Sequence, residues 1–361
     1  MLAATAALFA ACAETELVNE VNVESNSQEI GFSTYAGKVT RAENSEETAT
    51  DGLGIHHSDF NVWAYKNTHT AYVFDNVKVY LSGTAWKYDG AKYWDKAANK
   101  YEFYAAAPFR TEWILNTNGD ANQANDYFTF AGFVLEDKTL SSTSYDESLK
   151  SATNQDLMIA SPEPVLEGAI LSGATVQLDF NHILSRLNVT VKKSATLVNE
   201  VVNLTSISIN KLPNTGSFDE SDKEGHRWTL DNVTGSITGN ILNGVGATGA
   251  YVIQSLVMPQ DVYYAPIDRN GDHNVSTKAP YLYITYTIGS EPFKASYNLA
   301  NAFGIGKDSE KQFVAFNEGW QNTLNITIDA DAIEFDAVTY KWDVLTDGYP
   351  TIGNETNNTH P

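Results

Sequence analysis

Glycine and acidic residues form the stretches of this 361-residue chain that could carry cofactor or metal chemistry. Gly244, Gly246 and Gly249 have the spacing of a dinucleotide-binding loop, but the strand-like run AYVIQSLVM follows in place of the helix that would hold a pyrophosphate. Segments 116–126 and 268–273 cluster Asp and Asn side chains without the full spacing of a calcium loop. We therefore interpret all three as turns and expect no cofactor and no metal.

Histidine offers another route to chemistry. His56 and His57 are adjacent and would point to opposite faces of a strand, so they are predicted to be surface residues after the DGLG turn rather than ligands of one metal. His182 lies in DFNHILSRL between two predicted strands, where a structural role is favoured over a catalytic one. No GxSxG, HExxH or phosphate-binding loop motif occurs. The chain is predicted not to be an enzyme.

An aromatic segment raises a binding alternative. AWKYDGAKYW, residues 85–94, places an Asp-Gly turn between two aromatic runs, which is typical of a β-hairpin. Four of its side chains could stack on sugar rings: Trp86, Tyr88, Tyr93 and Trp94. Packing across the strands into a core is favoured, and glycan contact stays an alternative.

Charge limits the partners. The formal net charge is −22, and no basic stripe occurs along the sequence. Such a surface repels phosphate backbones, so no nucleic acid is expected to bind. The hydrophobic fraction of 42% is enough to fill a core.

Short runs of aromatic and β-branched residues recur along the chain, separated by Gly, Asn and Asp turns. FNVWAY at 60–65, RLNVTV at 186–191 and YLYITYTI at 281–288 are examples. No stretch longer than about ten residues keeps a helical period. The predicted fold is all-β, with two antiparallel β-sandwich domains over residues 42–194 and 195–361, divided at the polar junction KKSATLVNE.

The sole cysteine, Cys12, follows an apolar run, Leu2 to Phe9, and two alanines. The run is too short to span a bilayer and has the length of a signal-peptide hydrophobic region. The segment resembles a bacterial lipobox, which predicts a signal peptide over residues 1–11 and an acylated Cys12. The acidic AETE that follows resembles the signal that sends Bacteroidetes lipoproteins to the cell surface. A buried cysteine in an apolar terminus is the alternative.

Several segments, in their order along the chain, resemble the fimbrillins of Bacteroidales, the subunits of type V pili. They are LFAAC, IGFSTYAGKVTRA, FNVWAY, YEFYAAAP, DLMIA, FNHILSRLNVTV, ISINKLPNTGSF, VMPQ and IEFDAVTYKWDV. The resemblance implies two tandem transthyretin-like sandwiches in an outer-membrane lipoprotein. It also implies that an arginine-specific protease cleaves between Arg41 and Ala42 and removes residues 12–41, including the strand around IGFSTY.

The resemblance implies that the vacated groove accepts a strand donated by another fimbrial subunit. In this chain the donor would be 333–345, whose apolar set is Ile333, Phe335, Val338, Tyr340, Trp342 and Val344. The change of phase at Asp336-Ala337 predicts a bulge there. The same segment could instead be the last strand of its own domain, and the sequence leaves both readings open.

The predicted function is that of a fimbrial structural subunit at the cell surface. It would polymerise by protease-triggered donor-strand exchange and support adhesion to host or bacterial surface glycans or proteins. The alternative is an uncleaved surface lipoprotein that acts as a pilus anchor or tip, or as a glycan-binding adhesin.

Overall fold

A computed structural model describes residues 28–36, 53, 57–67, 72–117, 126–136, 155–222, 227–264, 279–306 and 313–341. Strands dominate this described part of the chain, which confirms the all-β fold. Among these residues, no helix has the length and apolar character needed to cross a membrane.

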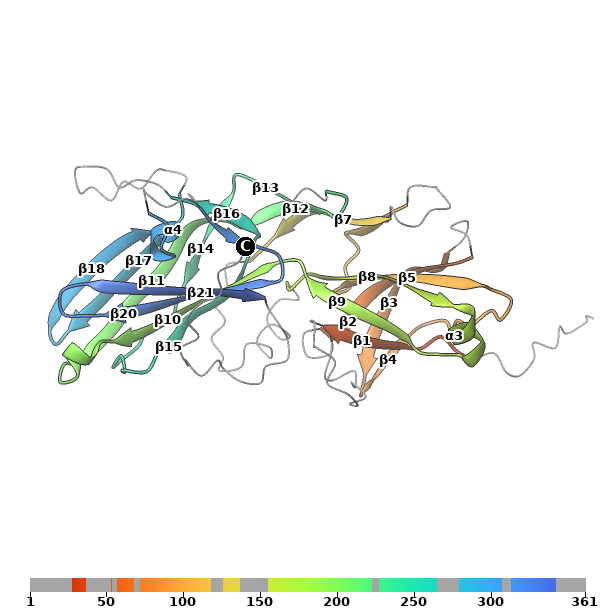
Figure 1. The fold of residues 1–361 in the computed structure, drawn as a ribbon, viewed down its shortest axis with the longest axis horizontal. Coiled ribbons are helices and arrows are strands. Elements are labelled where there is room, and N and C mark those ends of the chain that lie inside the picture. Colours follow the sequence, from red (N-terminus) through yellow and green to blue (C-terminus); the bar gives the residue numbers. More distant parts are fainter. Residues whose placement is uncertain are drawn as a thin grey trace, which may run out of the picture.

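A seven-stranded sheet forms one end of the elongated molecule (Figure 1), in the order β1-β9-β8-β5-β2-β3-β4. Its strands are β1 (Phe32–Ala36), β2 (Asp59–Lys66), β3 (Tyr72–Ser82), β4 (Ala85–Tyr88), β5 (Lys100–Ala107), β8 (Met158–Leu166) and β9 (Val176–His182). Helix α3 (Glu167–Ser172) connects β8 to β9. Every pairing in this sheet is antiparallel except that of β1 with β9, which is parallel.

Two four-stranded sheets form the other end. One has the order β15 (Ala250–Val257), β10 (Ser185–Lys193), β20 (Trp320–Ile328), β21 (Ile333–Lys341), and the other β14 (Thr234–Thr238), β11 (Val202–Pro213), β17 (Tyr281–Ile288), β18 (Glu291–Asn298). The pair β16 (Gln260–Tyr263) and β19 (Phe313–Phe316), the short helix α4 (Leu299–Ala302) and the 3-10 turn Ala195–Leu197 complete this end.

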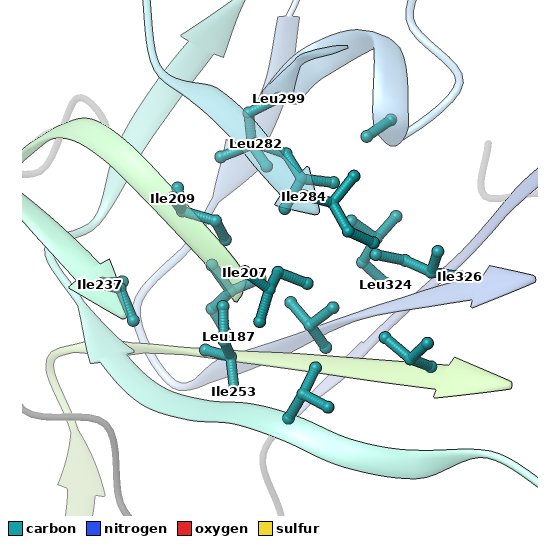
Figure 2. Close-up of a cluster of buried hydrophobic side chains, with 14 of the residues drawn as sticks. Leu187, Ile207, Ile209, Ile237, Ile253, Leu282, Ile284, Leu299, Leu324 and Ile326 are labelled. Carbon is teal, nitrogen blue, oxygen red and sulfur yellow. The ribbon is translucent and has the colours of Figure 1, made fainter. Parts of the chain in front are cut away.

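Aliphatic side chains from both four-stranded sheets meet in one core (Figure 2). Leu187, Leu324 and Ile326 come from one sheet, and Ile207 and Ile284 from the other. The alternation in YLYITYTI produces this arrangement, because successive residues of a strand point to opposite faces. The sequence period of two thus explains which side chains become buried.

A third sheet draws on both halves of the chain. Its order is β13 (Trp228–Leu230), β12 (Thr215–Asp219), β7 (Tyr127–Val134), β6 (Trp113–Asn116), and β7 and β12 lie between the two ends of the molecule (Figure 1). Its apolar residues pack with Leu157, Ile183 and Leu256 in a separate cluster. This middle sheet therefore joins the two ends.

Strand pairing does not follow the domain boundary expected at residue 194. β10 precedes that boundary, yet it pairs with β15 and β20, so the chain changes sheets at residues 183–184. The pairing of β7 with β12 also crosses the expected division. The tandem transthyretin-like arrangement stays a prediction.

Candidate functional site: the edge strand β1 and its groove

Strand β1 lies at the edge of the seven-stranded sheet, and β9 is its only strand partner among the residues that the structure describes. The parallel register runs from Phe32 opposite Val176 to Ala36 opposite Phe180. Just before the strand, Val176 N donates to Gly31 O at 2.9 Å. β1 is thus held along one side by a single short ladder.

The residues before β1 reach the opposite end of the same sheet. Ile30 N donates to Lys92 O at 2.9 Å, and Trp94 N donates to Gln28 O at 3.1 Å. The hydroxyl of Tyr88, at the end of β4, donates to Ile30 O at 2.8 Å. Burial raises the pKa of Tyr88 to about 12, so its hydroxyl remains a donor. Segment 28–36 therefore links both ends of the sheet.

Three side chains of this segment point into the core: Ile30, Phe32 and Thr34. The Phe32 ring has four aromatic neighbours in edge-to-face contact, at centroid distances of 6.2 Å to Phe60, 5.5 Å to Phe74, 5.8 Å to Tyr88 and 5.9 Å to Phe103. We call the space that these three side chains fill between β9 and β4 the β1 groove. Its centre is an aromatic pocket.

One polar contact is enclosed in the β1 groove. Trp86 Nε1 donates to Thr34 Oγ1 at 3.0 Å, and both side chains are buried. The Trp86 ring also lies 4.8 Å from that of Phe60. β1 is therefore fixed by side-chain contacts to β4 as well as by its ladder to β9.

The predicted donor segment forms β21, which pairs antiparallel with β20 of the same chain, from Ile333 opposite Ile328 to Lys341 opposite Trp320. Phe335 packs against the core, with its ring 4.7 Å from that of Tyr297. β21 is an edge strand, so one side of its backbone has no ladder among the described residues.

The bulge predicted at Asp336-Ala337 is wrong. The register of β21 continues without a shift through both residues. Ala337 takes the next inward place after Phe335, and Val338 is 47% exposed. Because Ala337 faces the core, inward and outward residues alternate throughout β21. The change of phase was inferred because alanine was not counted among the apolar residues. The side chain of Tyr340, together with Trp342 and Val344, lies outside the described residues.

The predicted processing positions also fall outside the described residues. Cys12, Arg41 and Ala42 are not among them, and neither is His56. Lipidation and cleavage thus remain predictions. Among the residues that the structure does describe, no group of three or more His, Cys, Asp and Glu side chains could hold a metal ion.

Comparison with known proteins decides the family. The sequence model of the fimbrillin-like family matches residues 40–342. The chain belongs to the fimbrillin-like family. Such proteins are fimbrial and adhesion proteins with structural rather than enzymatic roles. No curated protein sequence gave a match.

Solved structures share the fold of this fimbrillin-like protein. A fimbrial protein from Bacteroides vulgatus is 15% identical with a TM-score of 0.52, over 87% of this chain and 99% of that one. A candidate cell adhesion protein from Bacteroides ovatus is 12% identical with a TM-score of 0.51, over 89% of this chain and 99% of that one. At these identities the likeness concerns the fold alone.

The aromatic segment 85–94 of this fimbrillin-like protein packs mainly into the core, as favoured from its sequence, and does not form an exposed sugar-binding platform. Trp86 and Trp94 are 6% and 2% exposed and pack in the core of the seven-stranded sheet, and Tyr88 is only half-buried beside them. Of the four, only Tyr93 is exposed, at 53%. A buried indole cannot stack on a sugar in solvent, so the alternative of glycan contact does not hold for either tryptophan.

The predicted hairpin at Asp89-Gly90 is wrong as well. β4 pairs with the preceding strand β3 instead, through a turn at Gly83, and Tyr93 bridges to Glu29. The residues after the Asp-Gly turn thus extend toward the N-terminal segment. This is why the aromatic side chains surround the β1 groove.

A buried histidine cluster was missed by sequence reasoning. His57 is 0% exposed, although a surface position was predicted for it. His182 Nδ1 lies 3.0 Å from Asp156 Oδ1, and both residues are near the buried His57. His182 lies at the end of β9, next to the connection to β10, where its sequence context predicted a structural role. The sequence did not identify Asp156 as its partner, because the two residues are 26 positions apart and nothing in the DLMIA segment indicates this contact.

Proposed function

We propose that this fimbrillin-like protein is a fimbrial subunit that polymerises by strand exchange at the β1 groove. An arginine-specific protease would cleave between Arg41 and Ala42, and β1 would leave with residues 12–41. A strand from another fimbrial subunit would then occupy its place. The placement of β1 carries this proposal, because it is a short N-terminal edge strand that fills a core.

The energetics favour replacement of β1 by another strand over a groove that stays empty. Without β1, β9 would have unpaired backbone groups, and the pocket of Phe32 would be open. Burial of each apolar side chain stabilises by about 1.5–3 kcal/mol, and aromatic pairs add about 0.5–1.5 kcal/mol. An open groove of this kind binds a complementary strand by β-augmentation. The empty β1 groove would therefore bind another strand.

The donor in this proposal is 333–345, which this chain would give to the next subunit. Its described part, β21, is an edge strand with Glu334, Asp336 and Val338 exposed. Among the side chains of β21 that the structure describes, Ile333, Phe335 and Ala337 pack against the core, each of them partly buried. Detaching β21 would thus require fewer buried contacts to break than detaching a central strand.

The precursor would reach the cell surface as an outer-membrane lipoprotein. In this proposal residues 1–11 are a signal peptide and acylated Cys12 anchors the chain until cleavage releases it. The assembled fimbrium would then support adhesion to host or bacterial surface molecules.

The N-terminal residue of the protein in surface polymers tests the proposal. Ala42 is expected as the first residue, and Arg41→Ala should prevent formation of high-mass polymers. Lys38→Ala is the matched control, because it removes a nearby basic residue that an arginine-specific protease does not use. Polymers of Arg41→Ala at wild-type level would overturn the cleavage step. Acylated Cys12 in assembled material would favour the uncleaved anchor instead.

A further inference from the structure

Trp86 is a fixed donor inside the β1 groove. Its position on β4 is set by pairing with Leu81 of β3, and its ring lies edge-to-face against Phe60 at 4.8 Å. Since the side chain is 6% exposed, the indole N–H has little access to water. The direction of this N–H is therefore set by the protein and not by the strand that occupies the groove.

The hydrogen bond of this donor depends on the side chain of the occupant. An indole nitrogen donates and never accepts, and Thr34 Oγ1 accepts from it at 3.0 Å. An occupant with an apolar side chain at the same place would leave a buried N–H unsatisfied, which is unfavourable. By contrast, Tyr88 donates to the backbone oxygen of Ile30, which any residue type supplies.

The inward residues of β1 thus define a pattern of three alternate positions. Ile30 supplies an aliphatic side chain, Phe32 an aromatic ring and Thr34 a hydroxyl. Aromatic neighbours surround the second position, and Trp86 faces the third. The groove therefore requires a side chain of matching shape at the second position and a hydrogen-bond acceptor at the third.

We propose that the β1 groove selects its incoming strand through Trp86, which favours a strand with an aliphatic residue, an aromatic residue and Ser or Thr at alternate positions. This inference rests on the proposed strand exchange. It identifies Trp86 as the residue that determines specificity and a hydroxyl as the group that it recognises.

The chain's own β21 fits this pattern only in part. Ile333 and Phe335 reproduce the spacing of Ile30 and Phe32, but Ala337 stands where Thr34 would be. A second copy that donated β21 in this register would leave the Trp86 N–H without an acceptor. The preferred occupant is therefore a strand of a different subunit, one that carries Ser or Thr at this position.

Peptide competition tests the inference on the full chain, nicked after Arg41 so that residues 1–41 remain bound without a covalent link. Labelled peptides with the sequence of residues 28–36, QEIGFSTYA, are titrated and release of the resident segment is measured. The wild-type and Thr34→Ser peptides should compete equally, and Thr34→Val should need a concentration about tenfold higher. The β21 peptide DAIEFDAVT should improve about tenfold when Ala337→Thr is introduced.

Two further outcomes separate the inference from the exchange on which it rests. In the Trp86→Phe chain, which lacks the donor, the Thr34→Val penalty should disappear. Equal competition by the wild-type and Thr34→Val peptides in the wild-type chain would overturn the selection by Trp86 and leave strand exchange intact. Failure of every peptide, the wild-type sequence included, would overturn the exchange and the inference with it. The comparison of peptides on the wild-type chain does not depend on whether Trp86→Phe folds.

Discussion

His182 Nδ1 lies 3.0 Å from Asp156 Oδ1 at the point where the chain leaves the seven-stranded sheet. The two residues that follow are held by backbone and side-chain donors from other segments. Trp228 Nε1 donates to Ile183 O at 2.7 Å, and Gly319 N donates to Leu184 O at 2.8 Å. The connection between the two ends of the molecule is thus a hydrogen-bonded joint, in which the carbonyl groups of both residues have donors from distant parts of the chain.

The buried histidine near this joint, His57, should make the protein less stable in acid. Burial is the main reason why the pKa of His57 falls from 6.5 to about 4. Asp156 opposes this shift through its charge and a backbone hydrogen bond, and Asp59 opposes it weakly, whereas His182 lowers the pKa further. Between these two values the unfolded chain binds a proton that the folded chain does not. The free energy of unfolding should therefore fall as the pH drops from 6.5 to 4, by about 3 kcal/mol from this residue.

Urea unfolding at a series of pH values measures this dependence. His57→Gln is the comparison, since an amide of related size cannot titrate. Its free energy of unfolding should vary less between pH 6.5 and 4 than that of the wild type. An identical pH dependence in both proteins would contradict the assignment to His57.

Replacing Phe32 by alanine should destabilise the seven-stranded sheet strongly. The substitution empties the centre of four aromatic rings, and a buried Phe→Ala change costs about 3–5 kcal/mol. Phe32→Leu should cost less, because it keeps most of the volume. Ser33→Ala on the outward side of β1 should change the free energy of unfolding by less than about 0.5 kcal/mol. Similar losses for Phe32→Ala and Ser33→Ala in chemical denaturation would show that the pocket does not hold β1.

The all-β fold could be predicted from the sequence because alternation of residues within a strand is a local signal. Pairing between strands is not local. The parallel pairing of β1 with β9 and the pairing of β7 with β12 join segments that are far apart in the sequence. The residues of these four strands do not indicate which strand will be the partner. For the same reason the sequence did not indicate that the chain changes sheets at residues 183–184, before the polar junction near residue 194.

Local signals also competed with one another at the candidate site. The Asp-Gly turn at residues 89–90 is a strong hairpin signal, but the turn at Gly83 forms the hairpin, and the bridge from Tyr93 to Glu29 directs the later residues toward β1. The tryptophans became buried for the same reason. Their role in the β1 groove follows from closure of the sheet, which only tertiary structure reveals.

Two glycines should respond to alanine in opposite directions. A Cβ at Gly239 would lie 2.4 Å from Ile207 Cγ2 and 2.8 Å from Val252 O, so Gly239→Ala should lower the thermal unfolding midpoint. Gly168 lies in helix α3 with open space around it and without a positive φ, so Gly168→Ala should stabilise by about 0.5–1 kcal/mol. A wild-type midpoint for Gly239→Ala would mean that Ile207 moves aside at little cost.

Phe335 connects the stability of the subunit to the proposed donation of β21. Its ring packs against Tyr297 within the chain, so Phe335→Ala should lower the free energy of unfolding by about 2–4 kcal/mol, whereas Val338→Ala, at a 47% exposed position, should change it by less than about 0.5 kcal/mol. In assembled material the same ring would fill a pocket of the next subunit. Phe335→Ala should therefore also lower the resistance of polymers to denaturant. If β21 stays within its own chain, the substitution will weaken the monomer and leave the contacts between subunits unchanged.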